Sequence, residues 1–187
     1  LKSVRNLPDQ GIVKHPLNKT KGELNMRISK VTFITQAAVI AAIYTLLVIS
    51  FAPISSGPIQ TRIAEALTIL PYFTPAAIPG VTIGCFLSAV LTGSDILDII
   101  FGPIATLIGA ILSYYLRRYK FLVPIPPILS NAIIIPWVLK YAYGEAQPIP
   151  FMMLTVGLGE ILTAGIMGMI LLFALERVKP YIFRSDN

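Results

Sequence analysis

The hydrophobic residues of this chain fall into six long blocks, separated by short stretches that are polar or rich in proline and glycine. A helix needs about 20 apolar residues to cross a bilayer, with a lower limit of about 17. The pattern therefore predicts an all-α membrane protein with six transmembrane helices. The blocks run from Val31 to Phe51, Thr61 to Phe73, Pro75 to Leu91, Ile96 to Leu116, Leu122 to Tyr143 and Pro150 to Leu175.

The second and third blocks are the uncertain part of this topology, because residues 61–91 are few for two spans and many for one. The distribution of charge decides between the two readings. With six spans, 13 of the 15 Lys and Arg lie on one side; with five, the split is 8 against 7. Basic residues gather on the cytoplasmic side of membrane proteins. We therefore predict six spans, both termini cytoplasmic, and a short second span that is tilted or shielded by protein.

Composition agrees with a membrane protein. The chain is 55% hydrophobic and 13% charged, whereas a soluble domain has about 25% charged residues. The net charge of +6 follows from the topology, so we expect no nucleic-acid partner. Cys85 is the only cysteine and His15 the only histidine, which argues against a disulfide or a metal site. No phosphate-binding loop, HExxH, CxxC or GxSxG motif is present, so we expect neither a cofactor nor an enzyme.

The first 25 residues are polar and lack the apolar core of a secretion signal. Met26 then opens a short basic flank before the first apolar block. We interpret residues 1–25 as an N-terminal extension without a role in transport, and residues 26–187 as the six-helix transmembrane domain.

Acidic residues gather on the side opposite the basic flanks. In the predicted topology the outer half carries a net charge of about −3, and a cavity open to that side would favour a cationic ligand. We expect Asp95 to cap the fourth helix and Glu145 to be solvated in a loop. The acids are Glu65, Asp95, Asp98, Glu145 and Glu160, and the bases are Arg62 and Lys140.

Glu160, Asn131 and Asp98 are polar residues that fall inside predicted spans. Glu160 lies ten residues after Pro150, roughly 15 Å into the sixth helix, where an unpaired carboxylate costs about 2.5–3.5 kcal/mol. It must be paired, protonated or turned toward a wet cavity. Asn131 lies midway along the fifth block, and a buried amide needs partners, so it either contacts a ligand or bonds another helix. Asp98, one turn inside the fourth helix, is a further candidate.

Arg62 and Glu65 share one helix face because they are three residues apart. They either form a salt bridge with each other or line a cavity wall together with the preceding loop, APISSGPIQ. Irregular backbone at membrane depth survives only beside protein or a wet cavity, which favours the cavity. On the first helix, Ala37 and Ala38 repeat four residues later as Ala41 and Ala42, a small-residue stripe that suits an internal contact or a docking face.

Four stretches are spread over most of residues 27–175: GPIQTRIAEALTILPYFTPAAIPGVTIGC, DIIFGPIATL, PIPPILSNA and VGLGEIL. They resemble the queuosine-precursor transporter (QueT) family of S components from energy-coupling factor (ECF) transporters. The resemblance implies the six-helix S-component (RibU-like) fold, a multi-pass location in the bacterial cell membrane and a ligand site near the outer face. It also implies coupling to a transmembrane T protein and two ATPases. The implied substrate is 7-aminomethyl-7-deazaguanine.

The resemblance also implies roles for the polar residues. Glu160 or Glu65 accepts hydrogen bonds from the guanine edge, and Asp98 or the remaining glutamate balances the ammonium group. Asn131 reads another base edge. Gln60 and Arg62 lie beside the loop expected to close over the ligand.

Aromatic stacking on the base would come from Tyr72, Trp137 or Phe151, although Trp137 also suits an interfacial anchor. The pairs Ala37–Ala41 and Ala38–Ala42 would face the T protein. Three alternatives remain: an S component for another small vitamin-like nutrient, a stand-alone channel or carrier, and an assembly protein without a ligand. In the last, Glu160 and Asn131 would merely bond each other.

Overall fold

The structure is a computed structural model that describes residues 16–52 and 62–182, with side chains for 30–52 and 62–178. Every regular element in those ranges is helical. Contacts divide the chain into residues 1–33 and 34–187, and the second unit contains every helix from α2 onwards. The elements are α1 (Pro16–Phe51), η1 (Ile63–Tyr72), α2 (Ala77–Leu91), α3 (Ile96–Tyr115), η2 (Leu116–Arg118), η3 (Lys120–Leu122), α4 (Ile125–Ala142), α5 (Ile149–Glu160), η4 (Ile161–Met167) and α6 (Gly168–Ile182).

Helix α1 begins at Pro16, so the predicted boundary after residue 25 falls inside a helix. Proline is favoured at the first helical position. The Lys, Glu, Leu and Met residues that follow are good helix formers, and the apolar part of α1 continues the same hydrogen-bond ladder. Residues 1–15 lie outside the described part of the chain, and the absence of a transport role for the extension remains a prediction.

Four helical stretches are long and apolar enough to cross a membrane. Two further apolar helices, η1 and α2, are shorter. The six predicted blocks thus all correspond to helical segments, and length and composition support four of them as spans. The four stretches are Lys30–Phe51, Ile96–Arg118, Lys120–Ala142 and Ile149–Val178.

The short second block forms η1, a ten-residue 3₁₀ helix. A 3₁₀ helix rises about 2.0 Å per residue, so ten residues reach about 20 Å, against about 15 Å for an α-helix of the same length. Every residue from Ala64 to Pro71 is buried, and η1 packs against α2, α3, α6 and η4. The expected shielding by protein is therefore observed for this segment.

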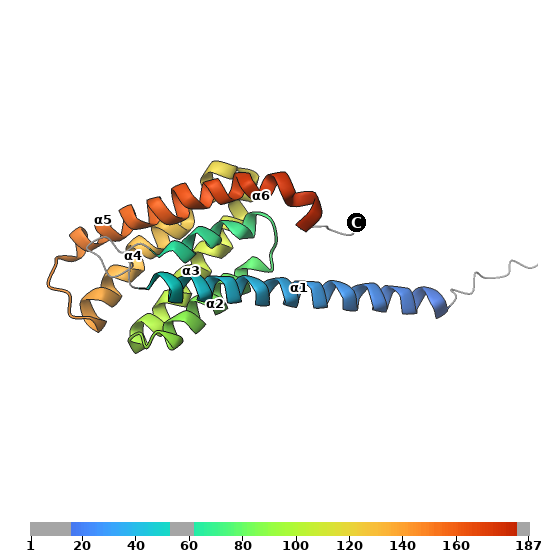
Figure 1. Ribbon diagram of the computed structural model, residues 1–187, viewed down its shortest axis with the longest axis horizontal. Coiled ribbons are helices and arrows are strands. Elements are labelled where there is room, and N and C mark those ends of the chain that lie inside the picture. Colours follow the sequence, from blue (N-terminus) through green and yellow to red (C-terminus); the bar gives the residue numbers. More distant parts are fainter. Residues whose placement is uncertain (1–15, 53–61, 183–187) are drawn as a thin grey trace, which may run out of the picture. The chain divides into compact units, whose positions relative to one another are not determined.

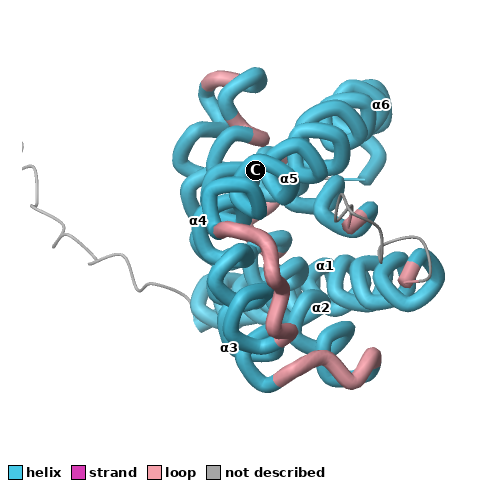
Figure 2. The backbone as a smooth tube through the Cα atoms, turned by 90° about the vertical axis from the view of Figure 1, so that its left-hand side faces the viewer, coloured by secondary structure: helices cyan, strands magenta, loops and turns pink. Residues whose placement is uncertain are grey.

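The helices from α2 to α5 pack on one another in chain order. Helix α2 packs on α3, α3 on α4, and α4 on α5, and Figure 2 shows α3, α4 and α5 as neighbours when the helices are viewed nearly end on. Helix α5, the π-helical segment η4 and α6 form one continuous rod (Figure 1). Glu160 is the last residue before the π-helical segment, and such segments frequently mark functional sites.

Helices α1 and α2 approach each other closely at two glycines. A Cβ atom built at Gly84 would lie 2.7 Å from Cβ of Tyr44 and 2.9 Å from the carbonyl oxygen of Ala41. At Gly80 it would lie 3.0 Å from the carbonyl oxygen of Ala37. The absent side chains let the helix backbones meet, and this contact fixes the position of Tyr44 beside η1.

Candidate functional site

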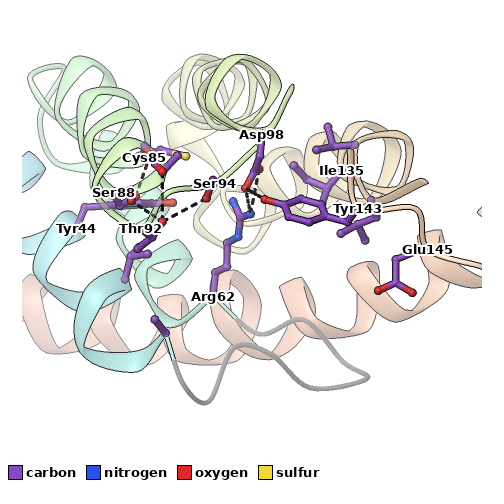
Figure 3. Close-up of a pocket in the computed structure, with 15 residues that line it drawn as sticks. Tyr44, Arg62, Cys85, Ser88, Thr92, Ser94, Asp98, Ile135, Tyr143 and Glu145 are labelled. Atoms are coloured by element: carbon purple, nitrogen blue, oxygen red, sulfur yellow. Dashed lines mark hydrogen bonds and ion pairs between the residues drawn. The ribbon is translucent and has the colours of Figure 1, made fainter. Parts of the chain in front are cut away.

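A pocket of about 370 Å³ opens where α1 and α4 end and α3 begins. We call it the Arg62 pocket (Figure 3). Its wall combines hydroxyl, carboxyl and guanidinium groups with aliphatic side chains, a mixture suited to a small polar ligand. It is lined by Tyr44, Val48, Ala52, Arg62, Cys85, Ser88, Ala89, Thr92, Ser94, Asp98, Ile135, Val138, Leu139, Tyr143 and Glu145.

An ion pair between Arg62 and Asp98 crosses this pocket. Arg62 precedes η1 in an extended conformation, and Nη2 of its guanidinium lies 3.1 Å from both carboxylate oxygens of Asp98. Asp98 lies in the first turn of α3 and is only 5% exposed. The hydroxyl of Tyr143 donates to the same carboxylate at 3.4 Å. Figure 3 shows these three side chains converging, with Glu145 set apart from them.

Glu65 lies in η1, three residues after Arg62, and is not among the residues that line the Arg62 pocket. It is 1% exposed, and its Oε1 accepts a hydrogen bond from the hydroxyl of Tyr44, which is fully buried. A salt bridge between Arg62 and Glu65, the less favoured of the two alternatives, is not among the ion pairs of the described residues, where Arg62 pairs with Asp98. The alternative interpretation, a cavity wall, agrees with the position of Arg62.

Glu160 and Asn131 form a second buried pair. The side-chain amide of Asn131 donates to Oε1 of Glu160 at 2.8 Å, and the two residues are 3% and 5% exposed. This is the interhelical hydrogen bond that the sequence allowed as one alternative.

A second, much smaller cavity of about 10 Å³ lies beside this pair, and we call it the Glu160 cavity. Its size corresponds to about one water molecule. Arg62 and Ile135 line both this cavity and the Arg62 pocket. The two cavities therefore adjoin the same guanidinium. The Glu160 cavity is lined by Arg62, Asn131, Ile135, Val156 and Glu160.

The structure brings together five of the seven predicted ligand-binding residues, from four different elements and the turn before η1. Gln60 lies outside the described residues, as does most of the loop APISSGPIQ. Trp137 is 47% exposed and lines a separate apolar groove. Its ring stacks on the ring of Tyr141, with 6.3 Å between the ring centroids. The five residues brought together are Arg62, Glu65, Asp98, Asn131 and Glu160.

The predicted stacking residues lie away from the Arg62 pocket. Tyr72, at the far end of η1, donates to Glu176 at 2.9 Å, and Phe151 is half exposed on α5. The aromatic rings that line the pocket are those of Tyr44 and Tyr143, which were not predicted from the sequence. A phenol inside an apolar helix needs a hydrogen-bond partner, and this was the signal available for Tyr44.

The remaining sequence predictions concern caps, loops and the alanine stripe. Asp95 caps α3, with its carboxylate accepting from the backbone N–H of Leu97 at 2.9 Å, and Glu145 is exposed, both as predicted. In the alanine stripe, Ala41 is buried beside α2, whereas Ala38 and Ala42 are exposed. Ala37 is half-buried against Gly80. One half of the stripe thus serves an internal contact.

Comparison with known proteins identifies the family of this chain. The QueT transporter family matches residues 34–177. The queuosine precursor transporter QueT of Lactococcus lactis subsp. cremoris (strain MG1363) is 38% identical over 85 residues, which are 44% of this chain and 50% of that relative. The chain thus spans about half the length of the curated relative that it matches. No solved structure matches the chain. Since the family match covers most of the sequence and includes the five clustered polar residues, the chain belongs to the QueT transporter family.

Proposed function

We propose that this chain is the substrate-binding S component of an ECF-type importer, and that it captures 7-aminomethyl-7-deazaguanine at the outer face of the bacterial cell membrane. The observation that carries the proposal is the cluster of three buried carboxylates, Glu65, Asp98 and Glu160, around the single base Arg62. Such a cluster attracts a cation, and its carboxylates accept the N–H groups of a guanine edge.

The ligand enters through the Arg62 pocket. Its ammonium group lies against Asp98 and the hydroxyl of Tyr143, which already converge there. Its guanine-like edge points toward Glu65 and Glu160, with Asn131 between them. A pocket of about 370 Å³ lies within the usual range of roughly 300–1,000 Å³ for small-molecule sites.

In the membrane, η1 and α2 cross together with the four long spans, giving six crossings with both termini cytoplasmic, in the S-component (RibU-like) fold. The 3₁₀ geometry and burial of η1 support this topology, because a short span must be shielded by protein. The Arg62 pocket then opens outward. The exposed residues Ala38 and Ala42 offer a close-packing face for the T protein, and two ATPases supply the energy for release.

Calorimetry on the detergent-purified protein tests the ligand, using 7-aminomethyl-7-deazaguanine and guanine. We expect a Kd below about 1 μM for the former. Glu65→Gln and Glu160→Gln each remove a charged acceptor and weaken binding by roughly 10- to 150-fold. The matched control is Glu176→Gln, which removes a partly exposed carboxylate from a residue that does not line the pocket and leaves binding within about twofold.

A folded protein that ignores deazaguanines but binds another vitamin-like molecule in the same pocket would favour an S component for a different nutrient. Uptake assays test the coupling. Import by cells should cease when the ATPases are deleted, whereas import that continues without them would favour a stand-alone carrier.

A further inference from the structure

Arg62 occupies a position between two acidic environments. On one side its guanidinium pairs with Asp98 in the Arg62 pocket. On the other side it borders the Glu160 cavity together with Asn131 and Glu160. Its side chain is 28% exposed, against 6% for that of Asp98. The Arg62 side chain is therefore the more accessible half of the ion pair.

Both inner carboxylates retain acceptor capacity. Among the described residues, none donates a hydrogen bond to Oε2 of Glu65 or Oε2 of Glu160, although both atoms are buried. Leaving a buried acceptor unsatisfied costs roughly 1–3 kcal/mol. Of these two carboxyl groups, Glu160 lines a cavity that Arg62 also borders.

The acidic residues near Arg62 do not share it equally. The guanidinium pairs with Asp98, whereas Glu160 lines the second cavity that Arg62 borders and has a buried oxygen without a donor among the described residues. A buried charge without a partner is strongly unfavourable, so Arg62 can leave Asp98 only when a second cation takes its place there.

We infer that Arg62 is an exchangeable internal cation that makes the pocket selective for ligands with a primary ammonium group. The ligand's ammonium replaces the guanidinium at Asp98, and Arg62 turns toward the unsatisfied oxygen of Glu160. A neutral ligand leaves the Arg62–Asp98 pair across the pocket and gains no ion pair. The inference rests on the proposed function in one respect, that the Arg62 pocket is the ligand site.

The test uses benzylamine, which is an arylmethyl ammonium at neutral pH, and benzyl alcohol as its neutral isostere. Binding to the full chain in detergent is measured by calorimetry and by the ligand-induced rise in unfolding temperature. We expect benzylamine to bind at least about tenfold more tightly than benzyl alcohol. Asp98→Asn should abolish this preference, and Arg62→Gln should strengthen benzylamine binding about tenfold while leaving benzyl alcohol unchanged.

A double-mutant cycle separates exchange from simple charge removal. Glu160→Gln should weaken benzylamine binding about tenfold when Arg62 is present, and should have little effect in the Arg62→Gln background. Matched controls are Glu176→Gln and Lys140→Gln, which remove one acid and one base from residues that line neither cavity. Arg62→Lys keeps the charge, and it takes the place of Arg62→Gln in the cycle if Arg62→Gln does not fold.

Equal binding of amine and alcohol, weaker amine binding in Arg62→Gln, or no coupling between Arg62 and Glu160 would each overturn the inference. So would a lack of benzylamine binding at tens of millimolar. Failure of the proposed function has a different result: benzylamine still binds with the predicted variant pattern, but 7-aminomethyl-7-deazaguanine does not bind.

Discussion

The side-chain amide of Asn131 donates to Oε1 of Glu160 at 2.8 Å and joins α4 to the end of α5. Both side chains are buried, so the loss of the donor leaves a carboxylate with less compensation for its burial. We predict that Asn131→Ala lowers the free energy of unfolding by about 1–3 kcal/mol, measured by denaturation in detergent.

The double variant Asn131→Ala/Glu160→Gln is the control for that prediction. It removes the charge as well as the donor, so its loss of stability should be smaller than the sum of the two single losses. An Asn131→Ala protein as stable as the wild type would contradict the prediction. So would a double variant whose loss of stability equals the sum of the two single losses.

The contact between Gly84 and Tyr44 leads to a second prediction. A methyl group at residue 84 would stand 2.7 Å from Cβ of Tyr44, closer than real side chains approach. Gly84→Ala must therefore push α1 away from α2, at a cost of about 1–3 kcal/mol, and displace the Tyr44 hydroxyl from Glu65. We expect lower thermal stability together with weaker ligand binding.

Gly157→Ala is the matched control, because its new methyl group would meet only Cβ of Ala132, at an ordinary 3.6 Å. That variant should retain stability and binding. If Gly84→Ala behaved like Gly157→Ala in both measurements, the close approach of α1 and α2 would not be what positions Tyr44.

The sequence was informative where burial of a polar group is costly. Arg62, Glu65, Asp98, Asn131 and Glu160 could each be selected from the sequence, because a charge or an amide inside an apolar block needs a partner. Which of these residues pair with one another could not be predicted from the sequence. The spacing of Arg62 and Glu65 suits a salt bridge on an α-helix, but Arg62 precedes a 3₁₀ helix and reaches Asp98, 36 residues away.

The sequence also could not show which aromatic residues face the pocket. Trp137 and Tyr143 lie on the same part of the chain, and each suits both an interface and a binding site. Only the rotation of α4 decides which ring turns toward the Arg62 pocket. The 3₁₀ and π-helical segments, η1 and η4, were likewise not predicted, since apolar periodicity does not distinguish them from an α-helix in a continuously hydrophobic block.

This difference between the two aromatic residues gives a third prediction. Tyr143→Phe removes a hydroxyl that bonds Asp98 at 3.4 Å, so we expect about two- to fivefold weaker binding of the ammonium ligand, measured by calorimetry. Trp137→Leu changes the apolar groove and should leave the affinity within about twofold. The reverse order of effects would place the ligand in the groove beside Trp137 instead.

The last prediction concerns the end of η1 farthest from Arg62. Tyr72 donates to Oε1 of Glu176 at 2.9 Å, and Nζ of Lys120 lies 2.6 Å from the same oxygen. The Lys120 and Glu176 side chains are 44% and 25% exposed, and ion pairs this accessible to solvent contribute about 0–1 kcal/mol. We therefore predict that Glu176→Gln lowers the free energy of unfolding by less than about 1 kcal/mol.

The small effect should shrink further in high salt, because salt screens exposed charges, and ligand affinity should not change. Arg117→Gln, an exposed change of one charge on η2, is the control for net charge. A loss well above 1 kcal/mol, or a loss of ligand affinity that Arg117→Gln does not share, would contradict the prediction. It would mean instead that this cluster holds η1 in the position in which Glu65 bonds Tyr44.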